Sequence, residues 1–271
     1  MTGVYNENCI DVMKRMEPCS VDLVVTSPPY DNLREYNNSS TWNFDIFKQI
    51  ADNLYRVIKE GGVVVWVVND ATIDGSETLS SFRQALYFKE IGFNVNDTMI
   101  WRKPNPIPQV EQPRYTQCFE YMFIFSKGVP KSFNPIQSRC KNGGKECKGS
   151  LKQITSGGIE RKVKTYKSSE SISEYNVWDI AVAQNHTDHP AVYPLELAKK
   201  HILSWSNEGD LVFDPFLGSG TTGIAARLLE REFVGTEIDK EYFDIAKTRV
   251  ENAFGNYDAK EEPQNQKLAL F

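Results

Sequence analysis

The chain contains short apolar runs that are rich in β-branched residues and show no alternation with polar side chains. Val21–Val25 and Val63–Val68 are the clearest examples. Such runs are typical of strands covered on both faces, as in a parallel sheet. Segments with helical spacing lie between them, beginning with Phe44–Lys59, for which Gly61 and Gly62 are the expected stop. The alternation predicts an α/β fold with a doubly wound, mostly parallel sheet.

The later segments continue this pattern. We expect helices at Phe82–Ile91, Leu195–Leu203, Thr222–Leu229 and Glu241–Ala253, and strands at Phe93–Trp101, Tyr121–Phe125, Leu211–Phe213 and Phe233–Glu237. From Lys127 to about Tyr175 the chain is rich in Lys, Gly, Ser and Asn without a sustained apolar period, so it resembles an insertion or mobile region. The expected division is 1–129, an inserted region at 130–175, 176–254, and a flexible tail at 255–271.

Composition is that of a soluble globular protein, with 40% hydrophobic and 25% charged residues. No apolar run approaches the roughly 20 residues of a membrane span, and the first twenty residues do not resemble a secretory signal. We therefore expect a cytoplasmic protein without membrane association. The five cysteines are odd in number, which predicts free thiols.

Positive charge is concentrated in one segment. The net charge is −5, yet nine Lys and Arg lie between Arg139 and Lys167 against only Glu146 and Glu160. A basic segment on an acidic protein fits a surface that faces phosphates. A solvated, lysine-rich loop explains the same charge, so charge alone leaves both interpretations open.

Two groups of metal-ligating residue types occur, and neither forms a convincing site. Cys140 and Cys147 have no second ligand pair nearby, and His186 and His189 have no third ligand. We therefore predict no metal.

A glycine-rich turn follows the strand at Leu211–Phe213 in the segment DLVFDPFLGSGTTG. The turn opens a helix, and the next strand ends at Glu237. In nucleotide folds the glycines permit close approach of a ligand, and the acid accepts hydrogen bonds from ribose hydroxyls. Taken alone, the segment also matches a hydride-transfer enzyme. Asp214 beside the turn would repel a pyrophosphate, however, and suits a cationic ligand such as S-adenosylmethionine.

The second informative segment is VDLVVTSPPY, in which a strand runs into two prolines. Each proline fixes φ and removes a backbone N–H, so the segment after the strand is rigid. A Pro-Pro pair that merely ends a strand is the alternative explanation.

Together the two segments resemble the β-type, permuted DNA amino-methyltransferases, in which the catalytic motif precedes the cofactor motif. The chain is similar in particular to the cytosine-N4-specific enzymes of restriction-modification systems. The resemblance includes the segments TSPPY, DPFLGSGTTGIAA and FVGTEIDKEYFDIAKTRV, and extends over nearly the whole chain except about residues 130–174. It implies a methyltransferase fold with S-adenosyl-L-methionine as cofactor and an inserted target-recognition region.

The resemblance also implies the site residues. The catalytic residues are Ser27, Pro28, Pro29 and Tyr30. The cofactor-binding residues are Asn8, Cys9, Asp214, Phe216, Gly218, Ser219, Gly220, Thr221, Thr222 and Glu237. His189, Pro190 and Pro194 are expected at the methionine end of the cofactor, and Tyr193 stands where the family commonly has lysine.

The chemistry explains why a rigid turn is needed at TSPPY. An exocyclic base amine is a poor nucleophile because its lone pair is delocalised into the ring. The Ser27 hydroxyl and the Pro28 carbonyl are suited to accept its N–H groups, and Tyr30 offers a face on which an extruded base stacks. Cys19, in a Pro-Cys pair like that of cytosine-C5 enzymes, precedes the strand, so we expect it to be a connector.

In this family serine at the first motif position is usual for cytosine N4 enzymes and aspartate for adenine N6 enzymes, so Ser27 favours cytosine. Adenine N6 methylation, a non-catalytic DNA-binding relative, and a protein or RNA methyltransferase are the alternatives. Duplex DNA is the expected partner, read by the basic region with help from Arg102 to Arg114. A cognate restriction endonuclease and a homodimer are further partners that the resemblance raises.

Overall fold

The protein divides into two compact units. Unit 1 comprises residues 1–134 and 176–271, and unit 2 comprises residues 135–175. The computed structural model describes residues 1–29, 42–106, 108, 113–141, 143–155, 158–182 and 193–253. Tyr30, His186, His189, Pro190 and the expected tail lie outside the described residues.

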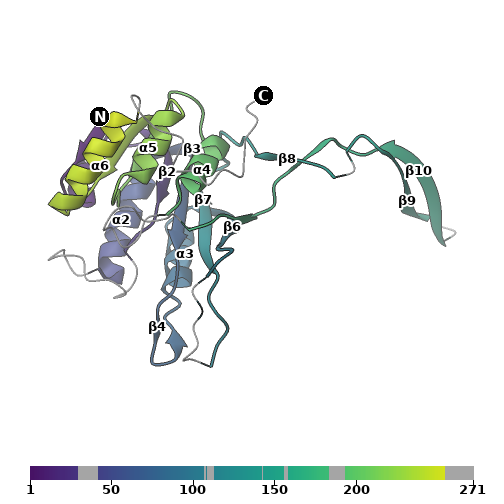
Figure 1. Ribbon diagram of the computed structural model, residues 1–271, viewed down its shortest axis with the longest axis horizontal. Helices are drawn as coiled ribbons and strands as arrows, with labels where there is room; N and C mark the ends of the chain where they lie inside the picture. The colour runs from purple at the N-terminus through teal and green to yellow at the C-terminus, as the bar shows by residue number, and fades with distance from the viewer. Residues whose placement is uncertain are drawn as a thin grey trace. The chain divides into compact units, whose positions relative to one another are not determined.

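Unit 1 is built around an eight-stranded sheet in the order β1-β14-β13-β2-β3-β7-β6-β12 (Figure 1). The strands are β1 (Gly3–Tyr5), β2 (Val21–Thr26), β3 (Ile58–Val68), β6 (Asn94–Arg102), β7 (Phe119–Ser126), β12 (Val177–Asp179), β13 (Leu211–Asp214) and β14 (Glu232–Thr236). Neighbours pair in parallel except for β3 with β7 and β7 with β6. The expected α/β fold with a mostly parallel sheet is confirmed.

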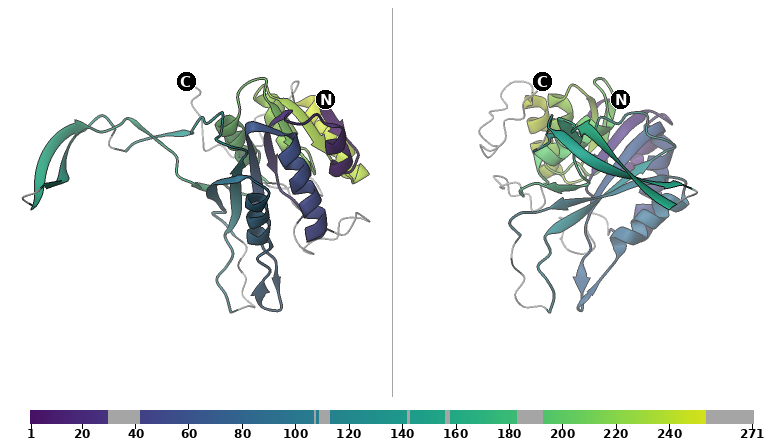
Figure 2. Two further views of the ribbon diagram at one scale, coloured as in Figure 1. Left: turned by 180° about the vertical axis from the view of Figure 1, so that it is seen from behind. Right: turned by 90° about the vertical axis from the view of Figure 1, so that its right-hand side faces the viewer.

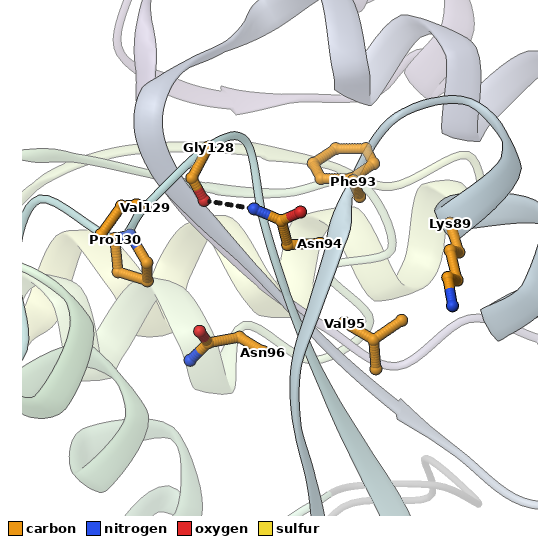
Figure 3. A pocket seen from close by; sticks show the side chains of 8 residues that line it. All are labelled: Lys89, Phe93, Asn94, Val95, Asn96, Gly128, Val129 and Pro130. Carbon is orange, nitrogen blue, oxygen red and sulfur yellow. Dashed lines mark hydrogen bonds between the residues drawn. The ribbon is translucent and has the colours of Figure 1, made fainter.

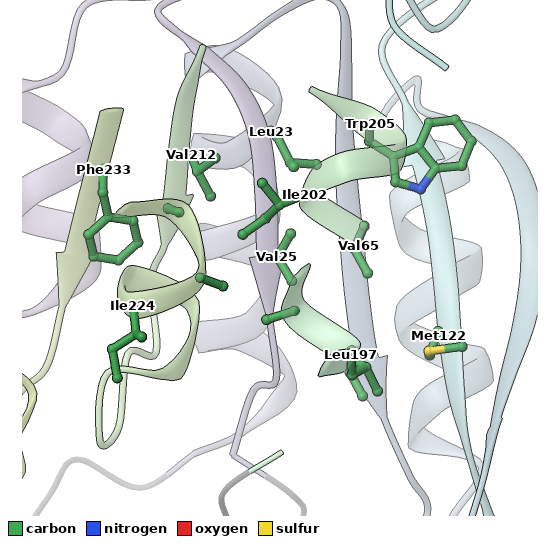
Figure 4. Packing of buried hydrophobic residues seen from close by; sticks show 14 of the residues in the cluster. Leu23, Val25, Val65, Met122, Leu197, Ile202, Trp205, Val212, Ile224 and Phe233 are labelled. Atoms are coloured by element: carbon green, nitrogen blue, oxygen red, sulfur yellow. The ribbon is translucent and has the colours of Figure 1, made fainter. Parts of the chain in front are cut away.

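Helices cover both faces of this sheet (Figure 1 and Figure 2). They are α1 (Cys9–Arg15), α2 (Phe44–Val57), α3 (Ser80–Glu90), α4 (Leu195–Trp205), α5 (Thr221–Leu228) and α6 (Lys240–Asn252). Helices α1 to α3 pack against one face around Phe47, Trp66 and Phe88. Helices α4 to α6 pack against the other face around Val25, Ile202 and Phe233 (Figure 4). The sheet is therefore doubly wound.

The predicted helix at Phe44–Lys59 is too long by two residues, and its predicted stop is wrong. The Asn43 side chain caps the start of α2, but the helix ends at Val57 and β3 begins at once. Gly61 and Gly62 lie inside β3, where the pairing with β2 is irregular. Gly61 has φ +78°, a left-handed conformation that glycine adopts without strain. The glycines therefore form a bulge in a strand.

Unit 2 consists of paired strands. Its long hairpin joins β9 (Glu146–Thr155) to β10 (Gly158–Lys167), and a shorter pair joins β8 (Gln137–Arg139) to β11 (Ser171–Ser173). These strands were not predicted, because the segment lacks the apolar alternation that marks a half-buried strand and backbone pairing does not require it. Residues 171–173 are exposed.

A small hairpin of β4 (Thr72–Ile73) and β5 (Ser76–Glu77) follows β3 in unit 1. In the described part of the chain, no helix is both long and apolar enough to cross a membrane. All five cysteines are free, as their number predicted.

Candidate active site

The two motifs recognised in the sequence meet at one edge of the sheet. β13 pairs in parallel with β2, with Val212 opposite Leu23 and Phe213 opposite Val24. The carboxyl ends of neighbouring parallel strands lie at the same edge, where α/β proteins bind their ligands. The Ser27-Pro28-Pro29 segment that follows β2 is therefore placed beside the glycine loop that follows β13.

Two glycines of the loop have left-handed backbone conformations. Gly218 and Gly220 have φ values of +53° and +94°, which favour glycine. A Cβ atom on Gly220 would lie 3.1 Å from the Ala246 Cα in α6. Gly223, the third glycine of GSGTTG, has an ordinary φ and a different role. Its Cβ would lie 2.6 Å from the Val250 Cγ2, so this glycine lets α5 pack closely against α6.

The Asp214 carboxylate is fully buried beneath the loop in a group that we call the Asp214 cluster: Thr26, Tyr193, Asp214 and Thr222. Oδ1 accepts from the Thr26 hydroxyl over 2.6 Å and from the Phe216 N–H over 3.0 Å. Oδ2 accepts from the Thr222 hydroxyl and lies 3.5 Å from the Tyr193 hydroxyl. Burial raises the pKa of the Asp214 carboxyl to about 6, although these hydrogen bonds oppose the rise.

Glu237 follows β14 and reaches back to the glycine loop. Its carboxylate accepts from the Gly218 N–H over 2.8 Å and from the Asp239 N–H over 2.9 Å. Burial raises the pKa of the Glu237 carboxyl to about 7, and the two N–H donors oppose the rise. The ionised form of this carboxyl, held at the loop, is suited to accept hydrogen bonds from ligand hydroxyls.

The turn after β1 forms the next side of the site. The Asn8 side chain caps α1 by accepting from the Ile10 N–H over 2.9 Å. Cys9 is buried, and burial raises the pKa of its thiol to about 12, so the thiol stays neutral. Asn6, which the sequence did not single out, donates to the carbonyl of Glu237 over 2.8 Å and so ties this turn to the end of β14.

Aromatic side chains gather where the glycine loop faces β3. The Phe216 ring lies edge-on to Trp42 at 5.6 Å between centroids and to Trp66 at 6.2 Å. In the preceding turn after β2, Pro28 is buried and Pro29 is half-buried. Tyr30, expected to stack the base, lies outside the described residues.

Several predicted cofactor residues are engaged with the protein itself. The Ser219 hydroxyl and carbonyl accept from the Arg249 guanidinium of α6 over 2.9 and 2.7 Å. Thr221 is buried at the start of α5, and the Thr222 hydroxyl lies within the Asp214 cluster. These side chains therefore hold the loop in place. Arg249 and Thr26 were missed in the sequence, although Thr26 is marked as the one polar residue that ends an apolar strand.

The structure also places Pro194 and Cys19, two further residues named from the sequence. Pro194 is the N-cap residue of α4. Cys19 is exposed in the turn before β2, at the opposite end of that strand from Ser27, as expected of a connector. Among the described residues, no three His, Cys, Asp or Glu side chains are grouped so as to hold a metal ion.

A pocket of about 480 Å³ lies near the start of β6 (Figure 3). Lys89, Phe93, Asn94 and Pro130 are among the residues that line it. β7 runs antiparallel to β3, with Ser126 opposite Val63, so the end of β7 lies at the amino-terminal edge of β3. The pocket is thus at the opposite edge of the sheet from the two motifs.

Comparison with known proteins identifies the class. A family model described as DNA methylase, which covers N6 and N4 methyltransferases, matches residues 21–248. The orphan methyltransferase M.BamHII of Bacillus amyloliquefaciens is 52% identical over 247 residues, which cover 86% of this chain and 90% of that protein. The Type II methyltransferase M.BglII of Bacillus subtilis is 31% identical over 257 residues, which cover 91% of this chain and 68% of that protein.

Solved structures agree with this fold. A complex of M1.HpyAVI with S-adenosylmethionine aligns with a TM-score of 0.62 at 28% identity, covering 92% of this chain and 99% of that one. The cytosine-N4-specific PvuII DNA methyltransferase aligns with a TM-score of 0.68 at 22% identity, covering 92% and 86%. The chain therefore belongs to the DNA methylase family of N6 and N4 methyltransferases. It is an enzyme that methylates DNA with S-adenosylmethionine as the methyl donor.

The residues at the loop fit this cofactor. S-adenosylmethionine carries hydroxyl, amino and sulfonium groups but no phosphate. The loop lies between the Asp214 and Glu237 carboxylates, which accept from its Phe216 and Gly218 N–H groups. The Arg249 side chain that touches the loop is bound to Ser219. An edge with two carboxylates suits a positively charged ligand with hydroxyl groups better than a pyrophosphate.

Proposed function

We propose that the enzyme methylates the exocyclic N4 amine of cytosine in duplex DNA. The observation that carries this proposal is the position of Ser27, a neutral residue directly after β2 and one residue from Thr26, whose hydroxyl is bonded to Asp214. The family resemblance associates serine at this position with cytosine N4 and aspartate with adenine N6. The cofactor supplies an electrophilic methyl group on its sulfonium.

The turn after β2 is proposed to bind and orient the target amine. We propose that the Pro28 carbonyl and the Ser27 hydroxyl accept the N–H groups of the target amine, which makes its lone pair available. The two prolines fix the direction of that carbonyl because their φ angles are restricted. Tyr30 is proposed to stack on a base that has been flipped out of the duplex. Holding the amine in line with the methyl group then provides most of the rate.

For the cofactor we propose direct contacts from Glu237, Gly218 and Gly220, with Phe216 at the adenine. Asn8 and Cys9 would lie on the same side, next to Glu237. The predicted residues Ser219, Thr221, Thr222 and Asp214 are proposed to act chiefly by holding the loop, since Thr222 and Asp214 are bonded to one another.

Unit 2 is proposed to be the target-recognition region, within the 130–175 segment expected from the sequence. Its basic residues would neutralise DNA phosphates. Arg102 and Arg114 are less suited to this than expected, because Arg102 is paired with Asp179 and Arg114 with Thr72 and Glu77. Replacing the exposed Lys148 and Lys167 with Gln should lower the salt dependence of DNA binding, whereas Lys14→Gln on α1 should not.

The experiment that tests the reaction is incubation with isotope-labelled cofactor and duplex DNA of mixed sequence, followed by nucleoside mass spectrometry. We expect labelled N4-methylcytosine. Labelled N6-methyladenine alone would assign the other reaction of the family, and the absence of labelled N4-methylcytosine would contradict the proposal. Tyr30→Ala should keep cofactor binding and lose most methyl transfer.

We propose that the enzyme acts in the cytoplasm and that its substrate is duplex DNA. A restriction endonuclease partner and a homodimer remain predictions from the resemblance to the family.

A further inference from the structure

The Asp214 cluster joins segments that are far apart in the chain. Thr26 ends the strand that leads into the catalytic turn, and Asp214 ends the strand that leads into the glycine loop. Their side chains are bonded over 2.6 Å although they are 188 residues apart. Tyr193 enters the cluster from the segment before α4, and its hydroxyl is bonded to the Thr222 hydroxyl. The cluster thus connects the two halves of the active site in its interior.

The hydroxyl protons in this cluster are limited in number. Thr222 has a single hydroxyl proton, but its oxygen lies near both the Asp214 carboxylate and the Val25 carbonyl, at 3.3 Å from the latter. When Asp214 is ionised, Thr222 donates to the carboxylate and accepts from Tyr193. The Tyr193 hydroxyl is then the donor that completes the chain of hydrogen bonds.

Within the described part of the chain, the donors to the Asp214 carboxylate are neutral. They are the hydroxyls of Thr26 from β2 and Thr222 from α5 and the Phe216 N–H of the loop, and the Tyr193 hydroxyl lies 3.5 Å from Oδ2. Glu237, after β14, is a second acid at the same edge, and its charge and that of Asp214 repel each other. Among the described residues, no Lys, Arg or His side chain bonds to the Asp214 carboxylate. Neutral hydroxyls and one backbone N–H therefore hold this buried carboxylate in place.

We propose that Tyr193 is a positioning residue for methyl transfer: through Thr222 and Asp214, its hydroxyl fixes the catalytic turn after β2 relative to the glycine loop after β13. Tyr193 acts through Asp214 and Thr26 and touches neither the base nor the methyl group in this role. The proposal rests on the family's methyl transfer from S-adenosylmethionine and is independent of which base amine receives the methyl group.

The physical reason is the sensitivity of in-line transfer to geometry. A misplacement of about 1 Å between reacting groups can lower the rate about 100-fold even when binding is unaffected. Removal of the Tyr193 hydroxyl takes one donor from the cluster, and this nearby hydroxyl is among the groups that lower the pKa of Asp214. The variant is therefore expected to slow transfer and also to raise the pKa of the buried carboxyl.

The test compares Tyr193→Phe with Tyr87→Phe. Tyr87 donates its hydroxyl to the Asp52 carboxylate over 3.0 Å, but on the surface between α2 and α3, which makes it a matched control. In single-turnover reactions on duplex DNA with saturating cofactor, Tyr193→Phe should lower the rate constant about tenfold or more. Its cofactor dissociation constant at pH 8, measured by calorimetry, should change less than about threefold, and Tyr87→Phe should leave both values unchanged.

The pH dependence of cofactor binding is the readout that a merely structural tyrosine would not change. Calorimetry from pH 5 to 8 should be done in the Glu237→Gln background, so that Asp214 is the remaining acid of the pair. The midpoint in this background should move to higher pH in Tyr193→Phe, because loss of the hydroxyl raises the pKa of Asp214. An unchanged midpoint together with an unchanged single-turnover rate would overturn the proposal.

A second pair of variants keeps the test decisive if Tyr193→Phe does not fold. Thr26→Val has nearly the shape of threonine but lacks its hydroxyl, whereas Thr26→Ser retains the hydroxyl and lacks the methyl group. If the Asp214 cluster positions the turn, Thr26→Val should lower the single-turnover rate constant about tenfold or more. Thr26→Ser should retain most of the wild-type rate constant. Equal rates for the two variants would show that the hydroxyl contacts do not position the turn.

Discussion

The role of Glu237 can be tested through the protonation state of its carboxyl group. Glu237→Gln keeps the shape of the side chain and resembles the protonated acid, but it cannot carry the negative charge. In the wild type the carboxylate accepts from the Gly218 and Asp239 N–H groups, and its pKa is raised to about 7 by burial. If the ionised form accepts the cofactor hydroxyls, the effect of the substitution must depend on pH.

The expected magnitude follows from these contacts. A hydrogen bond to a charged acceptor contributes about 1.5–3 kcal/mol, so Glu237→Gln should raise the cofactor dissociation constant about 10- to 150-fold at pH 8. With a pKa near 7, roughly nine-tenths of the wild-type carboxyl groups are ionised at pH 8 and roughly one-tenth at pH 6. The ratio of variant to wild-type dissociation constants should therefore fall about tenfold between pH 8 and pH 6.

Calorimetry with S-adenosylmethionine at both pH values measures this ratio. Glu232→Gln is the matched control, because Glu232 is exposed at the other end of β14. A ratio that stays constant with pH, or a dissociation constant unaffected at pH 8, would refute the role of the ionised carboxylate.

The raised pKa of Glu237 also predicts how the stability of the unliganded enzyme changes with pH. A carboxyl whose folded pKa lies above its unfolded value stabilises the fold fully below the unfolded value, and this contribution is lost as the pH rises through about 7. Thermal unfolding of Glu237→Gln should lack that part of the wild-type decline between pH 5 and pH 8. Identical pH profiles would contradict the raised pKa.

Three further variants test other contacts of unit 1. Gly223→Ala places a methyl group 2.6 Å from the Val250 Cγ2, and we expect this overpacking to lower the free energy of unfolding by about 1–3 kcal/mol; an unchanged thermal midpoint would contradict it. Arg249→Leu removes both hydrogen bonds to Ser219. The cofactor dissociation constant should therefore rise about 3- to 10-fold. Equal affinities of variant and wild type in calorimetry would contradict a role of Arg249 in holding the loop. Lys127→Met removes the ammonium that donates to the Tyr55 and Ile58 carbonyls at the end of α2, with an expected loss of about 1–3 kcal/mol in denaturant unfolding.

Much of the central sheet was predictable because burial on both faces leaves a direct mark on the sequence. Val63–Val68 is apolar throughout because helices cover both sides of β3. The ends of the elements were less predictable. Two consecutive glycines such as Gly61 and Gly62 are typical of a helix end. Here they form a bulge in β3, and their conformation depends on the pairing of β3 with β2. The strands of unit 2 were not predicted because their sequence lacks the apolar alternation of a half-buried strand, and backbone pairing does not require that alternation.

The sequence singled out the two motifs of the candidate site but not the residues that support them. The spacing of Gly218, Gly220 and Glu237 predicts a ligand loop, and the structure places the Glu237 carboxylate on the Gly218 N–H. Asn6, Thr26 and Arg249 hold the loop and turns from elsewhere in the fold. No local pattern marks such contacts, since they depend on which strands become neighbours. The bond between Thr26 and Asp214 becomes visible only after β13 is placed beside β2.

In the proposed reaction, the turn at Ser27 directs the methyl group of the cofactor to the N4 amine of cytosine. Duplex DNA that contains ¹⁵N at cytosine N4 and a cofactor with a ¹³C-labelled methyl group test this at the level of the bond formed. We predict a ¹³C methyl signal that is coupled directly to ¹⁵N in the NMR spectrum of the product, and its loss in Tyr30→Ala. A ¹³C methyl signal on the DNA without coupling to the labelled nitrogen would contradict the account.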